Sequence, residues 1–78
     1  MAYDSVKKIG QALIAQKLRN FVLVLKHPKN EKFRSDLEDM ISPPWRHWIE
    51  KKGMWIIDLD FIEEVEELCK RHFIDRQG

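Results

Sequence analysis

The sequence predicts a mainly α fold, a small single-domain bundle of about four helices with a short extended segment near residues 54–57. Apolar residues recur at helical spacing along much of the chain. Start and stop signals for helices occur at several places, and no turn signal separates Leu18 from Phe21. With 78 residues, we expect one domain spanning 1–78.

A chain of this length buries only about 60–65% of the surface that it exposes when unfolded, so its core is thin. Three Trp, four Phe and one Tyr can fill such a core. The single cysteine, Cys69, excludes an intrachain disulfide and favours a reducing, cytoplasmic setting. The longest apolar run has five residues, far short of a membrane span of about 20, and we expect no membrane contact.

The first segment, about 4–27, has two apolar sets at helical spacing and reads as a helix that Pro28 ends. The sets are Val6, Ile9 and Leu13, then Ile14, Leu18, Phe21, Val22 and Leu25. An alternative remains open, because 21–25 is apolar and rich in β-branched residues. In that alternative the fold is α+β, with strands near 21–25 and 54–57.

The second helix is expected to begin after Asn30, a good N-cap, and to end before Pro43. Glu31 lies in its first turn, where the helix dipole favours an acid. Its apolar face contains Phe33, Leu37, Met40 and Ile41.

The third helix is expected at 43–52. Ser42 suits its N-cap, Pro43 its first position and Gly53 the left-handed position after its end. Trp45, Trp48 and Ile49 would then share one helix face.

The extended segment 54–57 is too apolar for an exposed loop. The last helix begins at Asp58 or Asp60. One side of that helix is apolar and the other carries Glu63, Glu64, Glu66 and Glu67.

The net charge is only +1, which argues against a polyanion binder that acts through bulk charge. The distribution is uneven. Residues 1–53 hold eleven Lys/Arg against six Asp/Glu, and residues 54–78 hold three against seven. A basic body with an acidic last segment presents two complementary patches.

No catalytic constellation is evident, and we expect a protein that is not an enzyme. The chain has no Gly-rich phosphate loop, and its carboxylates lie on the expected outer face of a helix. Cys69 and His72 share a helix face, but a zinc site needs four ligands. We therefore expect no metal, no cofactor and no small-molecule substrate.

The candidate binding site is the Trp/basic segment 42–55 together with cations upstream of it. Its residues are Arg46, His47, Lys51, Lys52, Trp48, Lys29, Lys32 and Arg34. Trp and Arg are common at protein–protein hot spots, so we expect a protein-interaction, regulatory or accessory protein that also uses the acidic C-terminal helix. Its partner would be another protein or a second copy. The alternative is a nucleic-acid-binding domain, because cations interleaved with rings are typical of single-strand binding.

No family is recognised. The block 40–68 contains an apolar residue, Pro-Trp, Lys and Trp-Ile-Ile, followed by an expected helix. In this outline it resembles short modules beside helicase-type enzymes, over less than half of the chain and without any invariant chemistry.

Overall fold

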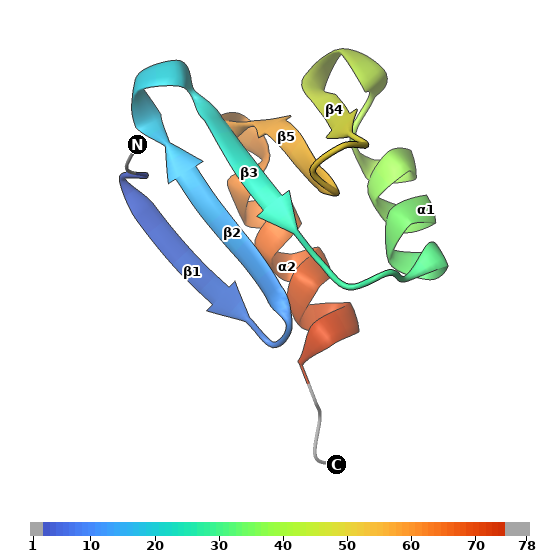
Figure 1. The fold of residues 1–78 in the computed structure, drawn as a ribbon. Helices are drawn as coiled ribbons and strands as arrows, with labels where there is room; N and C mark the ends of the chain where they lie inside the picture. The colour runs from blue at the N-terminus through green and yellow to red at the C-terminus, as the bar shows by residue number, and fades with distance from the viewer. Residues whose placement is uncertain (1–2, 75–78) are drawn as a thin grey trace.

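The computed structural model describes residues 3–74 and shows a five-stranded antiparallel sheet with two helices (Figure 1). The strand order is β1-β2-β3-β5-β4. The strands are β1 (Ser5–Ile9), β2 (Ala12–Lys17), β3 (Val22–Lys26), β4 (Arg46–Ile49) and β5 (Met54–Asp58). The helices are α1 (Glu31–Met40) and α2 (Ile62–Phe73), with short 3₁₀ turns at η1 (Leu18–Asn20), η2 (Pro43–Trp45) and η3 (Leu59–Phe61).

The expected four-helix bundle is therefore wrong, and the α+β alternative is closer. The expected helix over 4–27 is instead β1, β2 and β3. Gly10 has φ +60° and is the first of two residues that join β1 to β2, a position where type II′ hairpin turns favour glycine. Apolar residues three or four apart in the sequence are compatible with short buried strands, so periodicity alone misled the assignment.

The expected helix over 43–52 is also wrong. Pro43–Trp45 forms a single 3₁₀ turn, and the chain then enters β4 and turns back into β5. The Gly53 N–H donates to the Ile49 carbonyl at 2.8 Å and Gly53 has φ +64°, so the expected left-handed glycine closes a hairpin rather than a helix. A capping signature and a hairpin turn require the same residue types here.

Three sequence predictions are confirmed. The Asn30 side chain accepts from the Phe33 N–H at 2.9 Å, which caps α1. The extended segment at 54–57 is β5, and it pairs with β3 as the alternative proposed, with Leu25 opposite Trp55 and Leu23 opposite Ile57. The last helix exists as α2, and Asp58 caps the short turn before it by accepting from the Asp60 N–H.

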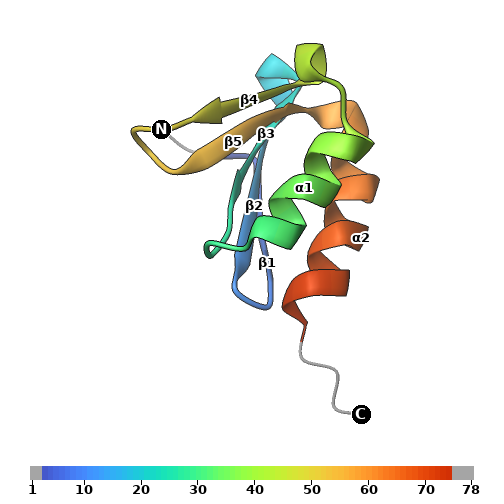
Figure 2. The same ribbon diagram turned by 90° about the vertical axis from the view of Figure 1, so that its right-hand side faces the viewer.

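Both helices lie on one face of the sheet, and the other face has no helix over it (Figure 2). The core fills the space between the two layers. Its sheet side includes Ile14, Leu25, Trp55 and Ile57, and its helix side includes Phe33, Leu37, Val65 and Leu68. Neither helix is long and apolar enough to cross a membrane within the described part of the chain.

Candidate functional site

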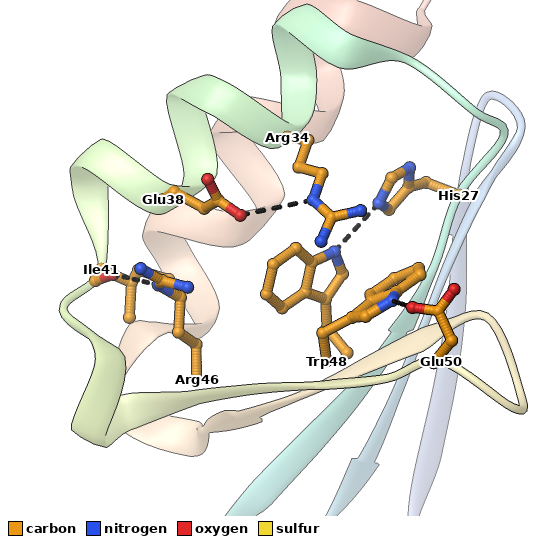
Figure 3. A network of polar contacts seen from close by, with 8 residues as sticks. His27, Arg34, Glu38, Ile41, Arg46, Trp48 and Glu50 are labelled. Atoms are coloured by element: carbon orange, nitrogen blue, oxygen red, sulfur yellow. Dashed lines mark hydrogen bonds and ion pairs between the residues drawn. The ribbon is translucent and has the colours of Figure 1, made fainter.

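A pocket of about 340 Å³ lies between the start of α1 and the β4–β5 hairpin, and it brings three of the expected binding residues together. Those three are Lys29, Arg34 and Trp48. The other lining residues are His27, Asn30, Glu31, Glu50 and Gly53. Figure 3 shows Arg34 reaching down from α1 toward the hairpin, with His27 on one side and Glu38 on the other. We call this the α1–hairpin pocket.

Arg34 joins the helix to the hairpin. Its Nε donates to Glu38 Oε2 at 3.3 Å, and its guanidinium lies 4.8 Å from the Trp48 ring centre and 5.5 Å from that of Trp55. A guanidinium over an indole stabilises by about 0.5–1 kcal/mol when partly exposed. Its charge is therefore already engaged by a carboxylate and two rings of the same chain.

His27 forms the polar side of the same cluster. Its Nε2 accepts the indole N–H of Trp55 at 3.0 Å, and its Nδ1 lies 2.8 Å from the Pro28 carbonyl. Both contacts are satisfied only by neutral imidazole with the proton on Nδ1. Burial lowers the pKa of His27, the Pro28 hydrogen bond raises it, and the nearby Arg34 charge lowers it further.

Trp48 and Arg46 also donate hydrogen bonds inside the chain. Trp48 donates its indole N–H to Glu50 Oε1 at 3.0 Å and meets the Trp55 ring edge-on at 5.1 Å between centres. Arg46 Nε donates to the Ile41 carbonyl at 2.7 Å (Figure 3). Since the members of this cluster pair with one another, its first role is to fix the hairpin against α1.

The remaining expected residues lie elsewhere. Alternation along β4 turns Arg46 and Trp48 toward the helices and His47 toward the open face. Lys51 and Lys52 are exposed in the turn of the hairpin, and Lys32 is exposed on α1 away from the pocket. The eight residues therefore do not form one surface.

The open face of the sheet has a pattern that was not expected. One row of paired residues crosses all five strands and consists of Val6, Ala15, Val24, Ile56 and His47. Its first four members are aliphatic. The rows beside it hold Lys8, Leu13 and Lys26 on one side, and Lys17, Val22 and Asp58 on the other. Val6 is 58% exposed, Leu13, Val22 and Ile56 are half-buried, and Ala15 and Val24 at the centre of the row are buried, at 4% and 8% exposed. We call this surface the open sheet face.

The two layers also differ in charge. The strands with their connections, residues 3–30 and 41–58, carry nine Lys/Arg against three Asp/Glu. The helix layer, residues 31–40 and 59–73, carries nine Asp/Glu against four Lys/Arg. The fold thus sorts a nearly neutral chain into a basic layer and an acidic layer.

Three exposed aromatic residues lie at one end of the sheet, next to the open face. Trp45 is 50% exposed just before β4, and Phe21 is 72% exposed just before β3. Tyr3 is 40% exposed just before β1, and the Lys17 Nζ lies 5.8 Å from its ring centre. Trp45 lines a shallow pocket of about 180 Å³ with Val22 and Ile56. The expected helix placed Trp45 and Trp48 on one face, so the sequence did not predict that Trp45 is exposed while Trp48 packs inward. The strand register is the signal that separates them, because it turns Trp48 inward beside Trp55.

Residues 3–74 contain neither an accessible thiol nor a cluster of metal-binding side chains. Burial, with a further effect of Glu66, raises the pKa of Cys69 to about 12, so its thiol is protonated and inaccessible. His72 Nε2 lies 2.9 Å from Asp36 Oδ2, in a contact between the two helices. No group of three or more His, Cys, Asp or Glu side chains in this range is arranged to hold a metal ion.

No protein-family model, curated protein or solved structure matches this chain, so its function has to be argued from the geometry above.

Proposed function

We propose that this protein is a non-enzymatic interaction protein, regulatory or accessory in role, that binds an acidic partner protein on its open sheet face. The observation that carries the proposal is the row across the sheet, which is aliphatic on four of its five strands and has lysines in both adjacent rows. No helix covers this row, and its accessible apolar surface comes from Val6 and Ile56, since Ala15 and Val24 are buried. Exposed apolar surface with polar residues around it is typical of protein interaction sites. The three lysines of this face, Lys8, Lys17 and Lys26, against one carboxylate, favour a negatively charged partner.

Trp45 extends the open sheet face at one end. Tryptophan is enriched at interface hot spots, because it buries a large area and loses little conformational freedom. At 50% exposure the Trp45 ring still has area to bury on a partner. The α1–hairpin pocket serves a different purpose in this proposal, since Arg34 and Trp48 hold the hairpin that carries Trp45 and β4.

Binding of single-stranded nucleic acid is the second candidate. The same lysines and the exposed ring of Trp45 favour it. The centre of the open sheet face argues against it, because Val6, Ala15, Val24 and Ile56 offer no ring on which a base could stack. With either partner we propose a cytoplasmic location, as the single cysteine predicts.

The test is a titration with three labelled probes: a peptide that alternates Glu and Leu, a peptide that alternates Lys and Leu, and oligothymidine. Fluorescence anisotropy at low and moderate salt reports binding. We expect the Glu/Leu peptide to bind, salt to weaken it, and the Lys/Leu peptide not to bind. Preference for oligothymidine would replace the first candidate with the second.

A matched pair of double variants locates the site. Lys17→Glu with Lys26→Glu changes the open sheet face, and Lys32→Glu with Lys70→Glu makes the same charge change on exposed positions of the helix layer. We expect the first variant to lose binding of the Glu/Leu peptide and the second to keep it. Equal losses would show that only net charge matters, and the proposal would be wrong.

A further inference from the structure

The turn that joins β2 to β3 presents apolar side chains to solvent. Leu18 is 49% exposed and Phe21 is 72% exposed, the largest exposed fraction among the large apolar residues described. Arg19 lies between them and is also exposed. We call this segment the Leu18–Phe21 turn. Its apolar area contributes little to the core of its own chain.

The backbone of the Leu18–Phe21 turn is nevertheless held firmly. Asp4 Oδ2 accepts from the Leu18 N–H at 2.8 Å, and the Phe21 N–H donates to the Leu18 carbonyl at 3.1 Å. The Phe21 carbonyl then accepts from the Leu59 N–H at 2.9 Å. A turn fixed in this way presents its side chains without an ordering cost on binding.

Phe21 adopts a costly conformation. Its φ of 57° and ψ of 39° lie in the left-handed region, and it is the one residue other than glycine with positive φ in the described chain. Glycine or asparagine adopts this region easily, whereas a bulky side chain is disfavoured there. Because the Phe21 ring is mostly exposed, packing within the chain does not offset this cost. A contact outside the chain would offset it.

A suitable acceptor exists on the helix layer of the same molecule. A pocket of about 320 Å³ lies between the end of α1 and the α2 residues from Glu63 to Arg71. The half-buried Met40 and the nearly buried Leu68, which is 2% exposed, supply its apolar part, and Glu63, Glu64, Glu67 and Arg71 complete its lining. Three glutamates against one arginine give this surface, which we call the glutamate-rimmed pocket, a negative charge.

We propose that Phe21 of one copy inserts into the glutamate-rimmed pocket of a second copy. The ring would meet the Met40 and Leu68 side chains, and Arg19 would lie among the glutamates. The Leu18–Phe21 turn and the glutamate-rimmed pocket are complementary in two ways, since the Phe21 ring would lie against apolar side chains and the Arg19 cation against carboxylates. They occupy different parts of the chain, so the contact is head-to-tail and builds chains or rings of copies.

Sedimentation velocity at low salt tests this self-association with two variants. Phe21→Gly removes the ring and relieves the left-handed strain, while Glu64→Lys with Glu67→Lys reverses the rim at exposed positions. We expect wild-type protein to sediment faster as its concentration rises. Each variant alone should associate at least about tenfold more weakly.

An equimolar mixture of the two variants gives the sharpest result. The Phe21→Gly protein keeps its pocket and the charge-reversed protein keeps its Phe21, so the mixture should form dimers that cannot extend further. Monomeric wild-type protein at all concentrations would overturn the proposal. Association that Phe21→Gly leaves unchanged, or a mixture that stays monomeric, would overturn it as well.

Thermal unfolding separates loss of the contact from loss of the fold. Phe21→Gly, and Phe21→Asn as a second variant, should leave the midpoint equal to or above that of monomeric wild type while association is lost. A lower midpoint in both variants would show that Phe21 serves its own fold. The contact does not depend on the open sheet face, so peptide binding and self-association can fail separately.

Discussion

Replacement of Trp55 by phenylalanine, with Trp45→Phe as its control, tests which of these two tryptophans stabilises the core. Trp55 is 1% exposed and donates its indole N–H to His27 Nε2 at 3.0 Å. It also meets Trp48 edge-on at 5.1 Å between ring centres. Trp45 is 50% exposed, and the structure shows no contact of comparable kind for it among the described residues.

The lost hydrogen bond and the weakened ring contacts each cost about 0.5–1.5 kcal/mol. We therefore expect Trp55→Phe to lower the free energy of unfolding by about 1–3 kcal/mol. Trp45→Phe should change it by less than about 0.5 kcal/mol, as is usual for an exposed site. Urea unfolding followed by far-UV circular dichroism measures both, independently of tryptophan fluorescence. Equal losses, or a larger loss for Trp45→Phe, would refute the assignment of Trp55 to the core.

Three further predictions concern the interior and the turns. The lowered pKa of His27 means that the unfolded chain takes up a proton first, so stability should fall as the pH decreases below about 6.5, the ordinary value. His27→Gln should lack this part of the pH dependence when both proteins are unfolded in urea across that range. A Cβ at Gly10 would overlap the Phe73 carbonyl oxygen, whereas among the described residues nothing except the two chain neighbours lies within 4 Å of a Cβ at Gly53. Gly10→Ala should therefore cost more than about 2 kcal/mol and Gly53→Ala about 1 kcal/mol, and equal midpoint shifts in thermal unfolding would disprove this. Cys69 should not react with a thiol reagent at pH 8 until the protein is unfolded, and rapid reaction of folded protein would contradict its burial.

The elements that sequence could predict are those with a local chemical signature. Asn30 and Glu31 mark the start of α1, and Pro28 separates it from β3. The acidic and apolar sides of α2 follow the helical period over twelve residues, long enough to be unambiguous. In these places local propensity and tertiary structure agree.

The strands were not predicted because each is short and is stabilised by pairing with another strand rather than by a local sequence signal. Four to six residues give too few alternations to separate a strand from a helical face. At Pro43–Gly53 the residues suit both a capped helix and a 3₁₀ turn followed by a hairpin. The pairing of β4 with β5 settles the choice, and β5 in turn pairs with β3, which joins residues 23 and 57.

The candidate site was predictable only in part. Composition predicted a cluster of rings and cations, and three of the eight expected residues, Arg34, Lys29 and Trp48, meet in one pocket while the others lie elsewhere. The open sheet face could not be found in the same way, because its row takes one residue from each of five strands. Phe21 was assigned to a helix, and its exposure follows from a left-handed turn that no sequence pattern announces.

Backbone amide shifts during a titration with the Glu/Leu peptide test the central claim most directly. If an acidic partner docks on the open sheet face, the largest changes should fall at Val6, Val24 and Ile56 and should shrink as salt is added. Changes confined to Lys29, Arg34 and Trp48 would place binding in the α1–hairpin pocket. That result, or no change at all, would contradict the claim.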